Sequence, residues 1–279
     1  MPALVLLSPA PGAGKTTVAA AISRRVSVSP MSRLGDDANA AADGSLFAKL
    51  GGSGGLELIE APGADPSAAP HANAVVVAGN ATPPADLLAF CQSAGERVAG
   101  VVLNKVPSRQ RKRVLGAVEE LGLKVLLALP EDRLLATPSL AEVASALQAQ
   151  TSFFDSNGDR SLDGAAIASI SADPGQGYFL DRAASTVIVR SDKPDLQLAA
   201  LNAGAACLIV TGSLPLLGYV TERAEADEIP VIRTALDTCE AMTTIEALFG
   251  SGPFSGAAAK LSRLAELIQG FDASTLSAA

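Results

Sequence analysis

A glycine-rich turn at residues 8–14 runs directly into Lys15 and two threonines near the N-terminus. Backbone amides that open a helix point at bound anions, and the helix dipole favours negative charge there. A lysine ammonium neutralises phosphate oxygens, and a threonine hydroxyl suits Mg²⁺. The spacing therefore predicts a site for the phosphates of a nucleotide, built from Gly12, Ala13, Gly14, Lys15, Thr16 and Thr17.

This segment resembles a Walker A loop, G-x-x-x-x-G-K-[ST], with one departure, because Pro9 stands at the first glycine position. Pro9 and Pro11 have no N–H group to donate. The amides expected to wrap the β-phosphate come later, between Ala13 and Thr16, so the departure leaves those donors in place. The alternative is a strand-to-helix turn that binds no ligand.

A carboxylate that faces the magnesium ion is expected at the end of a neighbouring strand. Glu60 follows the apolar segment 56–59 and precedes a Pro-Gly turn. We predict that Lys15 and Glu60 are catalytic and that Thr16 and Glu60 hold the metal. Asp37 lies between the segments 15–25 and 56–59, after a presumed second strand to which we give no bounds, and we predict it as a further metal ligand. The alternative in both places is an ordinary acidic residue beside a turn.

Short apolar runs and longer helical patterns alternate along the chain and must position these residues. The alternation predicts right-handed βαβ units, and hence an α/β protein whose mostly parallel sheet carries helices on both faces, followed by a smaller α/β region. Strands are predicted at 3–7, 56–59, 74–78, 101–103, 125–129, 186–189, 207–210 and 231–232. Helices are predicted at 15–25, 84–94, 108–121, 139–148, 195–203, 216–226, 239–249 and 257–268.

The alternation breaks at a polar stretch, residues 151–164. Polar segments with few apolar residues are typical of interdomain linkers. We therefore predict a nucleotide-binding domain at 1–150, a linker at 151–164 and a second domain at 165–279.

The first domain resembles, in pieces, the P-loop domain of dethiobiotin synthetase and cobyrinic acid a,c-diamide synthase. The matching pieces are the glycine-rich turn, I-E-A-P-G at 59–63, G-V-V-L-N at 100–104 and L-P-E-D-R-L-L at 129–135. The resemblance implies a P-loop NTPase-like fold and places Asn104 near an adenine. Pro107 stands where a GTPase carries its guanine-reading aspartate, which favours ATP. Ser29 precedes Pro30 where these ligases carry a lysine, so their ligase chemistry transfers less well than nucleotide binding.

The second half is similar to the DRTGG domain over residues 165–250. The segments that carry the similarity keep their order: 187–201, 207–213, 229–232 and 237–238. DRTGG domains also occur in the N-terminal regulatory part of some phosphotransacetylases, so the resemblance implies a regulatory role without the acyltransferase domain.

Loops that follow the strands of a parallel sheet gather at one edge and form a crevice. We predict a second ligand site at this edge, built from Asp192, Thr211, Gly212 and Asp237. The alternative for neighbouring residues is helix capping, with Asp195 and Thr238 as N-caps.

The composition excludes several other classes of protein. A net charge of −8 and a pI near 4.7 argue against nucleic-acid binding, which needs a basic face. One histidine excludes a multi-histidine metal site, and three well-separated cysteines fit reduced thiols. No apolar run reaches the roughly 18 residues of a membrane span, so we expect a cytoplasmic protein without membrane contact.

Three functional interpretations follow. The favoured one is a regulatory protein that binds MgATP and whose second domain senses a small molecule or a protein partner, or forms a homodimer. Slow ATP hydrolysis is left open. The first alternative is an ATP-dependent ligase of the dethiobiotin synthetase type acting on a small carboxylate. The second is a scaffold that no longer binds nucleotide, which the intact Lys15-Thr16-Thr17 run disfavours.

Overall fold

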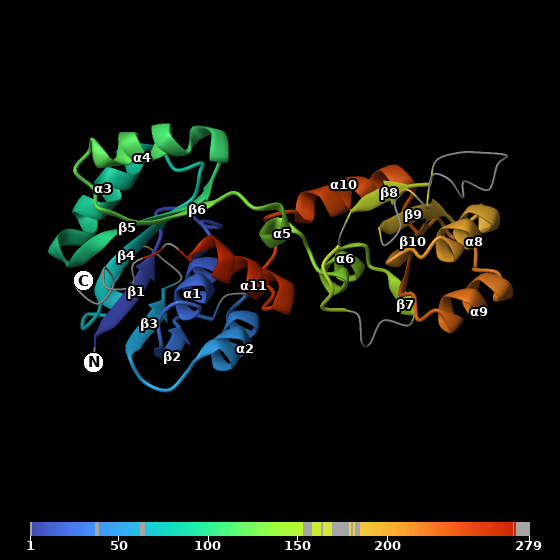
Figure 1. Ribbon diagram of the computed structural model, residues 1–279, viewed down its shortest axis with the longest axis horizontal. Helices are drawn as coiled ribbons and strands as arrows, with labels where there is room; N and C mark the ends of the chain where they lie inside the picture. The colour runs from blue at the N-terminus through green and yellow to red at the C-terminus, as the bar shows by residue number, and fades with distance from the viewer. Residues whose placement is uncertain are drawn as a thin grey trace. The chain divides into compact units, whose positions relative to one another are not determined.

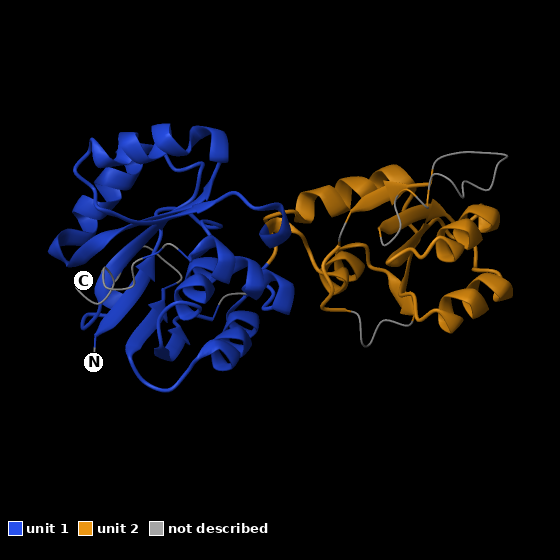
Figure 2. Ribbon diagram, viewed as in Figure 1, with its two compact units in different colours: residues 1–135, 253–279 blue, residues 136–252 orange. Residues whose placement is uncertain are grey.

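The computed structural model describes residues 2–36, 39–61, 65–152, 158–162, 164–168, 179, 181, 185–269 and 271. The chain forms two compact units (Figure 2). The first unit contains residues 1–135 together with 253–279, and the second contains residues 136–252. The first unit is therefore discontinuous in sequence.

The first unit is built on a six-stranded sheet in the order β2-β3-β1-β4-β5-β6, in which every pair of neighbours is parallel. Runs of valine, leucine and alanine form its central strands because these strands are covered on both faces. The bounds are β1 (Ala3–Leu7), β2 (Val28–Arg33), β3 (Leu56–Glu60), β4 (Asn73–Ala78), β5 (Val98–Val106) and β6 (Val125–Pro130).

Helices cover both faces of this sheet (Figure 1). On one face α1, α2 and α11 pack over a core that contains Ile22, Phe47 and Leu264. On the other face α3 and α4 pack over a second core that contains Leu87 and Val118. The bounds are α1 (Lys15–Ser23), α2 (Ala40–Leu50), α3 (Pro84–Ala94), α4 (Arg111–Glu119) and α11 (Ala258–Leu267), and α5 (Arg133–Ala136) is a single short turn.

The second unit has a five-stranded sheet in the order β7-β11-β10-β9-β8. Its strands are parallel except β7, which pairs antiparallel with β11. Helices α8 and α9 cover one face, and α6 and α10 cover the other. The bounds are α6 (Leu140–Ala146), β7 (Gln150–Ser152), β8 (Ala165–Ile167), β9 (Thr186–Arg190), α8 (Pro194–Asn202), β10 (Cys207–Thr211), α9 (Gly218–Ala226), β11 (Val231–Thr234) and α10 (Thr238–Leu248). The predicted α/β class, with a parallel sheet and a smaller second α/β region, is confirmed.

The two compact units differ from the predicted ranges 1–150 and 165–279. Helix α6 belongs to the second unit because Leu140 and Val143 pack into the same core as Ile245 of α10. Helix α11 belongs to the first unit because its apolar face packs against α1. An amphipathic pattern shows that a helix has a buried face, but it does not show which core that face joins.

The predicted linker at 151–164 also differs from the structure where its residues are described. Thr151 and Ser152 pair with β11, and Leu162 is buried in the core beneath α6. These residues therefore lie inside the second unit, and the chain passes between units at 135–136 and 252–253. Across the described ranges, none of the helices is both long enough and apolar enough to cross a bilayer.

Candidate functional site

The glycine-rich loop, residues 8–14, connects the end of β1 to the start of α1. Strand β1 lies in the middle of the first sheet, between β3 and β4. The strand order changes direction here, since β3 and β2 lie on one side and β4 to β6 on the other. Ligands of open parallel sheets bind beyond the carboxyl ends of the strands at such a point. The loop therefore occupies the position where the fold offers a binding crevice.

Two glycines give the loop its shape. Gly12 has φ +71° and Gly14 has φ +84°, values that residues with a Cβ adopt at a cost. Gly14 has a second requirement, because a Cβ on it would run into the side-chain amide nitrogen of Asn104. The loop thus needs glycine at 14 for its backbone angle and for its neighbour.

Gly14 also occupies the N-cap position of α1, and the part of the chain that the structure describes supplies no side-chain hydrogen bond to cap this helix. Helices α6 and α10 differ, since each begins with a complete capping box. The first turn of α1 has no acidic residue and begins with Lys15 and Thr16. Its amides are therefore available to an anion at the end of the loop.

Thr16 and Glu60 come together at the start of α1. The Thr16 hydroxyl donates a hydrogen bond to Glu60 Oε1 over 3.3 Å. Glu60 ends β3, the strand next to β1, and is 3% exposed. A hydroxyl and a carboxylate are the oxygen ligands that Mg²⁺ takes, so this pair fits the ion.

Arg33 lies beside Glu60 and pairs with Asp43, and sequence reasoning missed both of these charged residues. Arg33 Nη1, at the end of β2, forms an ion pair with Asp43 Oδ2 of α2 and lies 3.7 Å from Glu60 Oε1. All three side chains are buried. Residue 37, predicted as a metal ligand, lies outside the described residues, so Asp43 is the second carboxylate that the structure brings to this place.

Asn104 lies against the loop rather than in open space. It is 4% exposed, and its Nδ2 donates to the Ala13 carbonyl over 2.9 Å while its Oδ1 accepts from the Lys105 amide over 3.0 Å. Lys105 Nζ donates to the Gly12 carbonyl over 3.2 Å. The two side chains therefore hold the backbone of the loop, and the contact of Asn104 with adenine stays a prediction.

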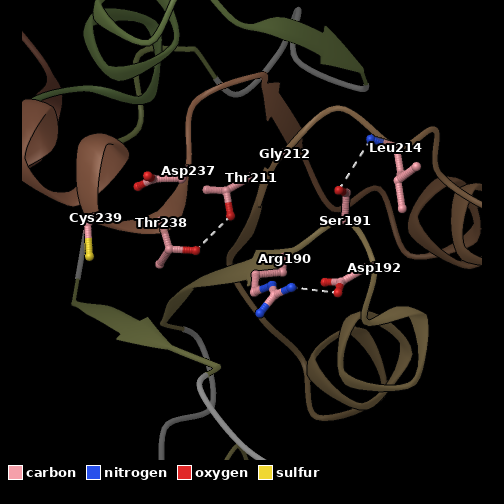
Figure 3. Close-up of a pocket in the computed structure, with 9 residues that line it drawn as sticks. All are labelled: Arg190, Ser191, Asp192, Thr211, Gly212, Leu214, Asp237, Thr238 and Cys239. Carbon is pink, nitrogen blue, oxygen red and sulfur yellow. Dashed lines mark hydrogen bonds and ion pairs between the residues drawn. The ribbon is translucent and has the colours of Figure 1, made fainter.

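The second unit carries a pocket of about 570 Å³ at the carboxyl ends of β9, β10 and β11 (Figure 3). The four residues predicted from the sequence as a second ligand site all line it. They are Asp192, Thr211, Gly212 and Asp237, and the other lining residues are Arg190, Ser191, Leu214, Thr238 and Cys239.

Hydrogen bonds organise the walls of this pocket (Figure 3). Arg190 pairs with Asp192 over 2.6 Å, and the buried Thr211 hydroxyl shares a 2.9 Å hydrogen bond with the Thr238 hydroxyl. The Asp237 carboxylate accepts from the Glu240 amide over 2.8 Å and so caps α10. The pocket therefore presents hydroxyls and charges of both signs around a small space.

Two comparisons with known proteins concern this unit. Residues 142–248 match the DRTGG domain. A solved structure, the CBS and DRTGG domains of the regulatory region of Clostridium perfringens pyrophosphatase complexed with the activator diadenosine tetraphosphate, is similar at 18% identity. That comparison covers 53% of this chain and 72% of that chain, with a TM-score of 0.33.

The DRTGG match begins 23 residues before the predicted start at 165, and it includes β7 and all but the first two residues of α6. The capping alternative also needs revision within this domain. Asp237 is the N-cap of α10, and Thr238 is the first helical residue. Lys193 precedes α8, so Asp195 lies inside the first turn of α8 instead of capping it. The sequence therefore placed the cap of α10 one residue too late, and the true cap, Asp237, is also a residue of the predicted second ligand site.

Proposed function

We propose that the protein is a nucleotide-binding regulatory protein, in which a P-loop unit binds MgATP and the DRTGG domain senses a second ligand or forms a dimer. One observation carries the proposal: the Thr16–Glu60 pair lies at the uncapped start of α1, directly after the glycine-rich loop. Backbone N–H groups that can bind phosphate, and a hydroxyl and a carboxylate that can bind Mg²⁺, lie together at one end of one helix. This arrangement fits a nucleoside triphosphate and its metal ion.

The first residues of α1 and Glu60 of β3 each have a role in this proposal. The amides at the start of α1 receive the β-phosphate, Lys15 neutralises the β- and γ-phosphates, and Thr17 donates to the α-phosphate. Thr16 and Glu60 hold Mg²⁺ by their oxygens. Bound magnesium supplies positive charge to the phosphate oxygens. Lys15 and Glu60 are the residues that would support slow hydrolysis.

The choice of ATP over GTP rests on two positions. Pro107 offers no carboxylate to the two N–H groups of guanine, and Asn104 is the polar side chain next to the loop. Ser29 stands in place of the ligase lysine within β2, so we do not extend the proposal to a ligase reaction.

For the DRTGG domain we propose that the pocket around Thr211 binds a small polar molecule. The support is the convergence of Asp192, Thr211, Gly212 and Asp237 on one space at the carboxyl edge of the sheet. Native mass spectrometry of the purified protein tests this, because a retained small molecule and the oligomer mass are both read from one spectrum.

The P-loop proposal is tested by Lys15→Ala with Lys49→Ala as the matched control. Lys49 is an exposed lysine of α2 in the same unit. Calorimetry should show that Lys15→Ala loses MgATP binding while the control binds as the wild type does, and circular dichroism should show both variants folded. Equal MgATP affinity in all three proteins would refute the proposal.

A further inference from the structure

Glu60 Oε1 has two neighbours of different kinds. It accepts the hydrogen bond of the Thr16 hydroxyl at 3.3 Å, and Arg33 Nη1 lies 3.7 Å from the same oxygen atom. The oxygen expected to ligate the metal is therefore also in ion-pair range of a guanidinium. A metal ion shared by Thr16 and Glu60 would lie within a few ångströms of that positive charge.

Burial strengthens the electrostatic effect of the Arg33 guanidinium on its neighbours. The side chains of Arg33, Asp43 and Glu60 are 8%, 3% and 4% exposed, so their charges are screened little. Arg33 holds Asp43 with the nitrogen that faces Glu60. A bound divalent ion is the largest charge in such a site, and it repels a nearby cation strongly.

We propose that Arg33 is a counter-cation built into the magnesium site, which competes with the metal for Glu60 and withdraws towards Asp43 when the metal binds. The inference rests on the proposed nucleotide site. It assigns Arg33 and Asp43 as positioning residues. Asp43 keeps Arg33 near Glu60, and it remains the partner of the Arg33 guanidinium when Glu60 turns to the metal.

The sign of the effect separates this proposal from a supporting role. A counter-cation that competes with Mg²⁺ must strengthen metal binding when it is removed. A residue that merely holds Glu60 in place must weaken metal binding when it is removed. The measurement is therefore the dissociation constant of ATP in EDTA divided by that in saturating Mg²⁺, which reports how much the protein gains from the metal.

Calorimetry with ATP should show this ratio about tenfold higher in Arg33→Gln than in the wild type, since one buried positive charge near the ion has been removed. Arg24→Gln is the matched control, because it removes the same charge from an exposed position at the end of α1. Its ratio should equal that of the wild type. An unchanged or lower ratio in Arg33→Gln overturns the proposal.

Arg33→Gln removes a buried positive charge that pairs with Asp43 and lies beside Glu60, and such a loss can prevent folding. Asp43→Asn and the double variant Arg33→Gln/Asp43→Asn then give the same test in a background with one carboxylate fewer. The double variant should have the higher ratio, again by about tenfold, and an equal or lower ratio overturns the proposal. Absence of ATP binding by the wild type in both buffers would instead refute the proposed nucleotide site.

Discussion

Replacing Gly14 by alanine should destabilise the protein more than the same replacement at Gly12, although both glycines have left-handed backbone angles. Gly12 has φ +71° and Gly14 has φ +84°. A Cβ at Gly12 would meet no atom within 4 Å, whereas a Cβ at Gly14 would collide with Asn104 Nδ2. The pair therefore separates the cost of the backbone angle from the cost of the contact.

The magnitudes follow from these two terms. A left-handed alanine costs about 1–2 kcal/mol, of which the stiffer unfolded chain returns about 0.4–1 kcal/mol. Gly12→Ala should therefore cost about 1 kcal/mol. At Gly14 the Asn104 amide must also move away from the Ala13 carbonyl, and losing a buried hydrogen bond costs about 1–3 kcal/mol more. Gly14→Ala should cost about 2–4 kcal/mol.

Urea unfolding followed by circular dichroism measures both costs. The two variants should differ by about 2 kcal/mol, which corresponds to about 4–8 °C in Tm for a domain of this size class. The second measurement repeats Gly14→Ala in an Asn104→Ala background. There the collision is gone, so the cost of Gly14→Ala should fall to that of Gly12→Ala.

Two results would refute this reasoning. Equal costs for the two glycine variants would mean that Asn104 gives way without loss. Strict additivity of Gly14→Ala and Asn104→Ala would mean that the two positions do not interact, and the tether from Asn104 to the loop would lose its support.

Three further predictions concern thiols, base choice and assembly. Burial raises the pKa of the Cys207 thiol to about 12, so about one molecule in 10⁴ carries the Cys207 thiolate at pH 8. Ellman's reagent should therefore modify the exposed Cys239 and spare Cys207 until the protein unfolds. The reactivity of Cys207 should rise only as the pH approaches 12. ATP should displace a fluorescent nucleotide at lower concentration than GTP does, since Pro107 removes a guanine contact that is usually worth about 1–3 kcal/mol; a GTP preference would contradict this. Light scattering should give twice 28.1 kDa for the full chain, and residues 136–252 should dimerise alone, because segment 214–219 exposes large apolar side chains; a monomer at micromolar concentration would contradict this.

Many elements could be predicted from the sequence because apolar residues follow one another in buried strands and recur every three to four residues in amphipathic helices. The segments 3–7 and 84–94 agree with β1 and α3 residue for residue. Helix α2 was missed because Gly44 is a poor helix former in the middle of the segment and few of the side chains are buried. Strand β7 was missed because three polar residues at a sheet edge have no apolar alternation.

The candidate site was predictable where neighbouring parallel strands bring their ends together. Thr16 and Glu60 meet because Thr16 follows β1, Glu60 ends β3, and these two strands are adjacent. Arg33 and Asp43 were not predictable, because a buried ion pair between a strand and an unpredicted helix follows no spacing rule. The signal that the sequence does carry is Arg33 itself, since it precedes Asp37 in the region of the presumed second strand, where a buried charged residue needs a partner.

The discontinuous first unit also sets the order in which the protein can fold as the ribosome makes it. Domains usually fold from the N-terminus as they emerge. Here the core against α1 includes Leu264, Ile268 and Phe271, so the first unit stays incomplete until these residues have left the ribosome. Residues 136–252 emerge earlier as one continuous segment. The second unit can therefore finish folding while the first unit, although its synthesis begins earlier, is still without α11.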